Sequence, residues 1–327
     1  MLLTHDQIKS ITRGAVAFEP DGEALHLHRC TATQRETYRA AGEGYYNRAC
    51  CTAGVRFDFR TDATSLAMSW RYGPRSSRNY LSVDCYVDGV LIDVFLDSSF
   101  VDDAGNSCSF ALPAGDKRVT IHLPYTVELI PTRVELSDGA SITPVVPAKR
   151  ILMIGDSITH GYDAKYTSQS YAMNVARYFD WDVINHGIAG YIHDANTIEN
   201  LPDWKPDIIT TAYGTNDWSK AKSVEEYDAP VRAFFTRLRE VWSDTPILGI
   251  LPVWRADLAK PRPSGSFDEM RARLAQIELS FPNVCVLDGM DAVPHNRSFY
   301  GDLRVHPNDM GFAHYAMAVI REIEKMI

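Results

Sequence analysis

Apolar and polar residues alternate with a period of two through much of the first half of the chain. In SLAMSWRYG (residues 65–73) and in KRVTIHLPY (residues 117–125), every second residue is apolar. Such alternation is typical of β-strands that bury one face and expose the other. We therefore expect a strand in each segment, with Leu66, Met68 and Trp70 on one face of the first.

Two hairpins are predicted in the same half of the chain. Asp88-Gly89 separates two strand-like runs within residues 83–97, and this dipeptide is the strongest short-range signal of a hairpin turn. ALPAGDKRVTI (residues 111–121) predicts a second, looser hairpin. Strands at this density, without helical stretches, predict an antiparallel β-sandwich of the jelly-roll type over roughly residues 10–137.

After residue 150, strand-like and helix-like segments alternate. RILMIGD (residues 150–156) is a continuous apolar run, as expected for a strand covered on both faces, and SYAMNVARYF (residues 170–179) follows with helical spacing. The further expected strands and helices are residues 182–187, 207–214, 224–242, 246–252, 267–279, 284–288 and a terminal helix around 312–323. Five strands alternating with helices predict an α/β fold with a parallel, doubly wound sheet. In such sheets chemistry belongs at the carboxyl ends of the strands.

A change in composition separates the two halves. In SDGASITPVVPAKR (residues 137–150), Pro144 and Pro147 are expected to interrupt both strand and helix. We predict a sandwich domain of residues 1–137, a linker of residues 138–149 and an α/β domain of residues 150–327. A chain of 327 residues is long enough for two cores.

The charge balance excludes some partners. The formal net charge of -9 divides into about −2 for residues 1–150 and −7 for residues 151–327, and no basic patch points to nucleic acid or an anionic membrane. The N-terminal segment lacks a basic region followed by a long apolar run, and no segment approaches the length of a membrane span. We expect a cytoplasmic protein; a homo-oligomer is left open.

The cysteines and histidines give no sign of a metal site or cofactor. The six cysteines have no CxxC spacing, so we expect buried thiols in place of a disulfide framework or a zinc site. His26 and His28 share one strand face and could bind a metal, yet no third ligand is evident in the sequence. We expect neither a metal nor an organic cofactor.

A candidate nucleophile follows the first strand of the α/β half. GDSITHG (residues 155–161) is neither a phosphate-binding loop, because no Lys-Ser/Thr follows Gly161, nor a GxSxG elbow. It does place Ser157 on a tight turn at the start of a helix, where free backbone N–H groups could stabilise an oxyanion. Taken alone, a serine at a helix start is usually a cap.

Three other positions call for the same explanation. NHGIAG (residues 185–190) ends the second strand with Gly190, and YGTNDW (residues 213–218) follows the third with Asn216. Each is compatible with a simple turn or cap. Together, however, a serine, a backbone N–H and a side-chain amide after three successive parallel strands make the arrangement that an oxyanion hole requires. His306, just before the last helix, would be the base that a serine nucleophile needs.

These motifs resemble the four sequence blocks of the SGNH hydrolases, or GDSL-type esterases: GDSIT, NHGIAG, GTND and VHPND. The resemblance covers residues 150–327 and is weakest in the second block. It implies a flavodoxin-like sheet with strand order 2-1-3-4-5, Ser157 as nucleophile and His306 as general base. It also implies an oxyanion hole of the Ser157 N–H, the Gly190 N–H and the Asn216 side chain. A sandwich before such a domain is similar to the two-domain carbohydrate acetyl esterases of this superfamily.

One position departs from the family pattern. The aspartate that orients the base lies three residues before the histidine in most of the family, and here that position is Leu303. Asp302 is one residue too early. Either Asp302 completes a triad through a small bulge, or a backbone carbonyl holds the imidazole and the pair is a Ser-His dyad.

The sequence therefore predicts a serine esterase that hydrolyses a small carboxylic ester through an acyl-enzyme. The two-domain resemblance implies an acetyl group on a carbohydrate, with a small molecule or oligosaccharide ester as substrate. The same residues would also serve a thioesterase, lysophospholipase or acyltransferase, and a carbohydrate-binding protein with an inactive hydrolase domain is a non-enzyme alternative. Four residues near the strand ends could contact substrate or simply pack: Trp254, Arg255, Tyr213 and Trp218.

Overall fold

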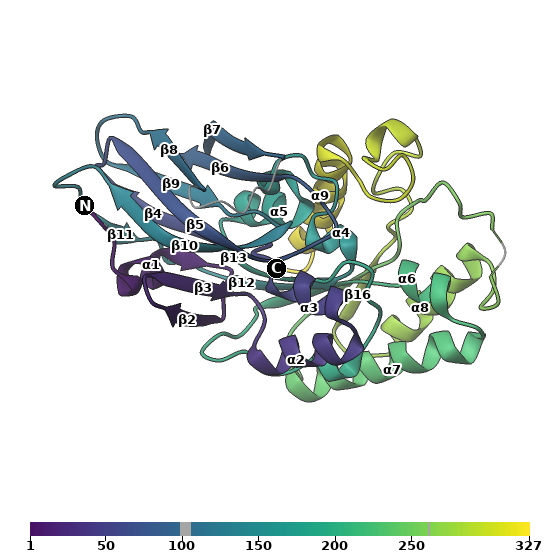
Figure 1. Ribbon diagram of the computed structural model, residues 1–327. Coiled ribbons are helices and arrows are strands. Elements are labelled where there is room, and N and C mark those ends of the chain that lie inside the picture. Colours follow the sequence, from purple (N-terminus) through teal and green to yellow (C-terminus); the bar gives the residue numbers. More distant parts are fainter. Residues whose placement is uncertain (99–105, 261) are drawn as a thin grey trace.

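The computed structural model describes residues 1–98, 106–260 and 262–327 (Figure 1). Residues 99–105 of the predicted sandwich, and Pro261, lie outside the described residues. The antiparallel strands of the N-terminal half lie together on one side of the molecule, and the parallel sheet with helices α7 and α8 lies on the other. In the described part of the chain, no helix combines the length and the apolar character needed to cross a membrane.

The C-terminal half is built on a five-stranded parallel sheet, as predicted. Its strands in spatial order are β13 (Asp182–Gly187), β12 (Arg150–Gly155), β14 (Ile208–Ala212), β15 (Ile247–Ile250) and β16 (Val284–Leu287). This order is 2-1-3-4-5 along the chain, which confirms the expected topology. Residues of β12 alternate between two cores, with Ile151 and Met153 on one face and Leu152 and Ile154 on the other, so the strand is apolar throughout.

Helices cover both faces of this sheet. One face packs against α5 (Tyr171–Phe179) and α9 (Asp309–Glu324), and the other against α7 (Val224–Val241) and α8 (Phe267–Leu279). Two short helices, α4 (Ser157–His160) and α6 (Thr215–Lys220), begin directly beyond the carboxyl ends of β12 and β14. Short 3₁₀ turns lie at Thr167–Gln169, Ala195–Thr197 and Arg297–Phe299.

The N-terminal half contains antiparallel sheets. The largest has the order β1 (Thr12–Arg13), β4 (Arg56–Thr61), β9 (Lys117–His122), β6 (Leu81–Val87) and β7 (Val90–Asp97), with β11 (Thr143–Pro144) also paired to β4. A second has the order β10 (Val127–Leu136), β5 (Ser65–Arg75) and β8 (Ser107–Ala111), and β2 (Ala17–Asp21) pairs with β3 (Ala24–His28). Both larger sheets contribute to one core, in which Phe57 and Val119 of the first meet Leu66 and Val134 of the second.

One predicted hairpin is confirmed and the other is wrong. The hairpin of β6 and β7 turns at Asp88 and Gly89, whose φ angles are 47° and 81°, as a turn with two left-handed residues requires. β8 and β9, in contrast, do not pair with each other: β8 pairs with β5, and β9 lies between β4 and β6. The loop between β8 and β9 therefore passes from one sheet to the other, since local alternation identifies strands but not their partners.

The expectation that the first half has no helices is wrong. It contains α1 (His5–Ile11), α2 (Ala32–Ala41) and α3 (Glu43–Cys50). Both α1 and α2 begin with a capping box, formed by Thr4 with Gln7 and by Thr31 with Gln34, and this signal is readable in the sequence. α2 and α3 contribute residues to the core on the face of the parallel sheet that α7 and α8 cover.

The segment expected to be a linker is paired to the antiparallel sheet. Thr143 and Pro144 form β11 against Arg60 and Phe59, so Pro144 does not interrupt a strand here. The strand is only two residues long and pairs on one side only, and a proline is tolerated at a sheet edge because no N–H is needed there.

The six cysteines, all of them described, are free thiols. The prediction that they are buried is confirmed for Cys30, Cys50, Cys51 and Cys85 and wrong for Cys285, which is exposed; Cys108 is intermediate. Cys285 lies on β16, the edge strand of the parallel sheet.

Candidate active site

Ser157 begins helix α4 immediately beyond the carboxyl end of β12. The side chain of Asp156 caps this helix by accepting a hydrogen bond from the N–H of Ile158 at 3.0 Å. The helix lies very close to the end of β13: a Cβ at Gly187 would be 2.1 Å from the backbone nitrogen of His160. Glycine at position 187 therefore permits the approach that brings the second strand end beside Ser157.

His306 lies between Ser157 and Asp302. Its Nε2 is 2.8 Å from Ser157 Oγ, and its Nδ1 is 2.8 Å from Asp302 Oδ2. Because an ionised carboxylate only accepts hydrogen bonds, Nδ1 carries the ring proton and donates a hydrogen bond to Asp302. Nε2 is then free to accept the hydroxyl proton of Ser157, which is the tautomer that a general base requires.

The loop before His306 folds around the carboxylate of Asp302. Oδ1 accepts hydrogen bonds from the N–H groups of Arg304, Val305 and His306 at 2.9, 2.8 and 3.1 Å. Burial acts to raise the pKa of Asp302, but the bonds from His306 and the backbone outweigh it and hold the pKa well below its usual range. Leu303 is the extra residue in this spacing, and its backbone lies in the left-handed region, with φ at 56°.

A second carboxylate lies near the imidazole, and sequence reasoning missed it. Asp163 Oδ2 is 3.7 Å from His306 Nδ1 and has no hydrogen-bond partner within the described part of the chain. Its other oxygen accepts a hydrogen bond from Arg78 Nε at 2.5 Å, and the Arg78 guanidinium lies 4.5 Å from the ring centroid of Tyr162. Arg78 comes from the connection between β5 and β6, so the antiparallel half supplies a charged group beside the candidate base.

Asn216 is on the first turn of α6 and points its amide toward the base of α4. Its Nδ2 donates a hydrogen bond to Asp156 Oδ2 at 3.2 Å. Asp156 is fully buried, and burial raises its pKa to about 6. The aspartate of GDSIT therefore both caps the helix that begins with Ser157 and orients the amide of Asn216.

Gly190 lies in the loop after β13, and hydrogen bonds to its carbonyl oxygen hold it in place. The carbonyl oxygen accepts hydrogen bonds from Lys220 Nζ at 2.6 Å and Tyr45 Oη at 3.4 Å. The same loop is attached to the first strand end through the Ile188 N–H, which donates to the Gly155 carbonyl at 2.8 Å. Lys220 is four residues after Asn216 on α6, and no motif indicated this role for it.

A buried histidine–aspartate pair joins the loop that carries Gly190 to helix α6, which carries Asn216. His193 Nδ1 and its backbone N–H lie 2.9 and 3.0 Å from Asp217 Oδ1. Burial acts to raise the pKa of Asp217, but His193 outweighs it and lowers the pKa. The loop after β13 and helix α6 are thereby fixed relative to each other.

The four predicted substrate contacts are differently placed. Tyr213, Trp218 and Arg255 are buried. Trp218 donates its indole N–H to the Gly265 carbonyl at 2.9 Å, and Arg255 binds Asp257 at 2.6 Å and the Thr215 hydroxyl at 2.9 Å. Trp254 is partly exposed and stacks on His295, with ring centroids 5.8 Å apart.

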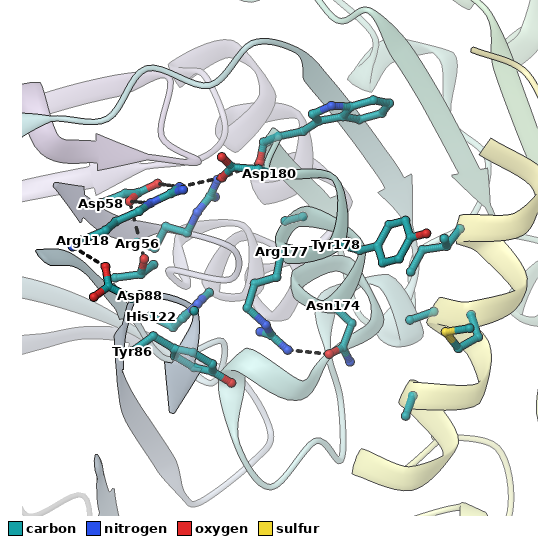
Figure 2. A pocket seen from close by; sticks show the side chains of 18 of the residues that line it. Arg56, Asp58, Tyr86, Asp88, Arg118, His122, Asn174, Arg177, Tyr178 and Asp180 are labelled. Atoms are coloured by element: carbon teal, nitrogen blue, oxygen red, sulfur yellow. Dashed lines mark hydrogen bonds and ion pairs between the residues drawn. The ribbon is translucent and has the colours of Figure 1, made fainter. Parts of the chain in front are cut away.

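A cavity of about 680 Å³ lies away from these residues, between the large antiparallel sheet and helices α5 and α9 (Figure 2). None of the predicted site residues lines it. Figure 2 shows its charged wall, where Arg118 binds both Asp58 and Asp180 at 2.7 Å, while Arg177 binds Asn174 at 2.5 Å. These charges already have protein partners.

A known protein family matches most of the parallel-sheet half of the chain. Residues 153–314 match the GDSL-like Lipase/Acylhydrolase family. The parallel-sheet half of the chain is therefore similar to this family. No curated protein matches the sequence.

Solved structures resemble this chain over nearly its full length. The salicylyl-acyltransferase SsfX3 from a tetracycline biosynthetic pathway is 24% identical, with a TM-score of 0.82 over 96% of this chain and 94% of that one. A GDSL-like lipase from Bacteroides ovatus is 19% identical, with a TM-score of 0.75 over 100% and 97%. A family two carbohydrate esterase from Cellvibrio japonicus is 17% identical, with a TM-score of 0.65 over 98% and 96%. At these identities the likeness is one of fold. Together with the family match, it supports ester hydrolysis or acyl transfer as the general chemistry.

Proposed function

We propose that this protein is a serine esterase in which Ser157, His306 and Asp302 form the catalytic triad. The observation that carries the proposal is the continuous hydrogen-bonded chain from Ser157 Oγ through the imidazole to Asp302 Oδ2, with both distances at 2.8 Å. A nucleophile, a base and a group that orients the base are the minimum set for acyl transfer at neutral pH.

In the proposed reaction, Ser157 Oγ attacks the ester carbonyl carbon while His306 Nε2 takes the hydroxyl proton. The negative charge on the carbonyl oxygen is stabilised by the N–H groups of Ser157 and Gly190 and by the Asn216 amide. The alcohol then leaves with the proton from His306. Water, deprotonated by the same imidazole, attacks the acyl-enzyme and releases the carboxylic acid and free Ser157.

We further propose an acetylated carbohydrate as substrate. Its support is the resemblance in fold to carbohydrate esterases, one of which, from Clostridium thermocellum, was solved in complex with cellohexaose. Among the predicted contacts, the partly exposed Trp254 suits a sugar ring best, because an exposed aromatic face can stack on it. We also propose that the two larger antiparallel sheets, which share one core, form the predicted β-sandwich domain of residues 1–137.

An acyltransferase is the second candidate. It is favoured by the likeness to the salicylyl-acyltransferase, whose coverage of both chains exceeds 90% at a TM-score of 0.82. The two reactions share the acyl-enzyme and differ in the acceptor, which is water in one and an alcohol in the other.

The test is turnover of p-nitrophenyl esters from acetyl to octanoyl by the native protein and by Ser157→Ala. We expect turnover that depends on the serine and is highest for acetate, together with release of acetate from acetylated oligosaccharides. Equal turnover by both proteins would refute the serine mechanism. If an added alcohol accelerates p-nitrophenol release and becomes acylated in preference to water, the acyltransferase is correct.

A further inference from the structure

Two histidines and a glutamate converge on the antiparallel side of the molecule. His26 and His28 are alternate residues of β3, and their rings are stacked with centroids 5.4 Å apart. Glu128 belongs to β10, which lies against β3. One ligand atom from each of the three residues lies within 4.8 Å of the other two. Because Glu128 is about 100 residues away in the sequence, no spacing motif could have indicated it.

The distances suit a small divalent metal ion. Glu128 Oε1 is 2.7 Å from His26 Nδ1 and 3.7 Å from His28 Nδ1. A tetrahedral zinc ion with bonds of about 2.0–2.1 Å holds its ligand atoms roughly 3.3 Å apart. The two distances lie on either side of that value, and one nitrogen of each imidazole lies within 4.8 Å of the other.

The far side of the His28 imidazole has the partner that a metal-bound histidine uses. His28 Nε2 faces Glu19 Oε2 at 3.4 Å, and Glu19 is itself held by Arg35 at 2.7 Å. A carboxylate on the second ring nitrogen fixes the tautomer that leaves the first nitrogen free for a metal. His28 is buried, and its Nδ1 makes no hydrogen bond to the residues that the structure describes.

The protein also leaves room for the glutamate. Gly73 of β5 lies beside Glu128, and a Cβ there would be only 2.3 Å from Glu128 Oε2. Glu128 and His28 are buried, whereas His26 is partly exposed. The cluster is therefore closed on the protein side and open toward solvent at His26, which gives an ion a path to it and a place for a bound water.

We propose that His26 Nδ1, His28 Nδ1 and Glu128 Oε1 bind one zinc ion, with water as the fourth ligand, and that the ion joins β3 to β10. Two imidazoles and a carboxylate are ligands that zinc favours. The competing arrangement is a hydrogen bond between His26 and Glu128 without a metal.

The test is zinc binding by chain stripped with a chelator, measured by calorimetry and by elemental analysis after dialysis. The background is Cys285→Ser, because an exposed thiol also binds zinc. We expect one zinc per chain, a higher unfolding temperature with zinc, and loss of both effects in Glu128→Gln. Glu19→Gln should weaken binding by about 10–100-fold, as for other second-sphere carboxylates. Absence of stoichiometric zinc in the Cys285→Ser protein would overturn the proposal.

Two controls locate the ion. His306→Ala removes a second cluster of the described residues that could hold a metal, formed with Asp163 and Asp302, and His314→Gln changes an exposed histidine of α9. Both should retain one zinc per chain, and loss of zinc in His306→Ala would place the ion in the active site and refute the proposal. If Glu128→Gln does not fold, the partly exposed His26→Gln decides: a folded His26→Gln that binds zinc as tightly as its parent also refutes it.

Discussion

Replacing Asp302 with asparagine separates a triad from a dyad. The substitution removes the negative charge beside His306 Nδ1 while keeping an oxygen that can accept the three backbone N–H groups now bound by Oδ1. The loop should therefore keep its shape. In the proposed mechanism, what is lost is the stabilisation of the imidazolium that forms when Ser157 attacks, and the preference for the Nδ1–H tautomer.

The expected loss follows from the geometry. Two unit charges about 4 Å apart interact by about 4 kcal/mol at an effective dielectric constant of about 20, which corresponds to roughly 10³ in rate. The Asp302 side chain is 27% exposed, and solvent reduces the effect. Asp163, 3.7 Å from the same nitrogen, supplies part of the missing charge. We expect kcat to fall by about 10²–10³, less than the factor of about 10⁴ reported for a fully enclosed triad aspartate.

The assay is steady-state hydrolysis of p-nitrophenyl acetate, with kcat and KM determined separately at pH 8. KM should change little, because Asp302 acts on the base and not on bound substrate. Asp291→Asn, which alters a carboxylate that is 93% exposed, is the matched control and should retain native kcat. A loss below about threefold in Asp302→Asn, with the control unchanged, would reject the triad and favour a backbone carbonyl as the partner of His306.

Three further predictions follow from the same contacts. Asp163→Asn alone should lower kcat less than tenfold. Combined with Asp302→Asn, it should lower kcat by about tenfold more than the product of the single effects, because each carboxylate partly replaces the other. A double-mutant cycle measures this coupling. Asp156→Asn should raise stability by about 1–3 kcal/mol above pH 6, because burial raises the pKa of Asp156 to about 6 and its ionised form is costly in the folded state. That gain in stability should disappear as the pH falls from 6 to 4, because Asp156 is protonated at a higher pH in the folded protein than in the unfolded chain. Urea unfolding at pH 8 and pH 4.5 checks the sign of the stability change. At both pH values kcat should fall, because Asn216 loses its hydrogen-bond acceptor. Gly187→Ala should destabilise the protein by more than about 2 kcal/mol in the same unfolding assay, because its Cβ would lie 2.1 Å from a backbone nitrogen of α4.

The parallel-sheet half could be predicted because the apolar residues that mark its strands also indicate that helices cover both faces of the sheet. β12 is apolar on both faces, and this alone indicates a strand with helices on either side. In the antiparallel half, alternation located β8 and β9 but not their partners, which are set by contacts between distant strands. α2 was missed although Thr31 and Gln34 mark its start, because strand density outweighed a local cap.

The residues of the candidate site also fall into two groups, those that the sequence predicted and those that it did not. Ser157 and Asn216 were predicted from motifs at strand ends, since parallel strands bring such ends to one edge of the sheet, and His306 was predicted from its place just before the last helix. Asp163 and Arg78 could not be predicted, because their contact with the site joins a connection in the antiparallel half to a turn after α4. Such contacts have no fixed sequence spacing.

The spacing of Asp302 has a physical explanation in its loop. With the acid four positions before the base, the chain needs one residue in the left-handed region, and Leu303 takes that position at a cost of about 1–2 kcal/mol. The carboxylate of Asp302 in return accepts three backbone N–H groups and the imidazole N–H, and hydrogen bonds to a charged group contribute about 1.5–3 kcal/mol each. The bonds outweigh the strain several-fold. A departure of one residue from the family spacing is therefore compatible with the same acid beside the same base, because the loop is held by the carboxylate itself.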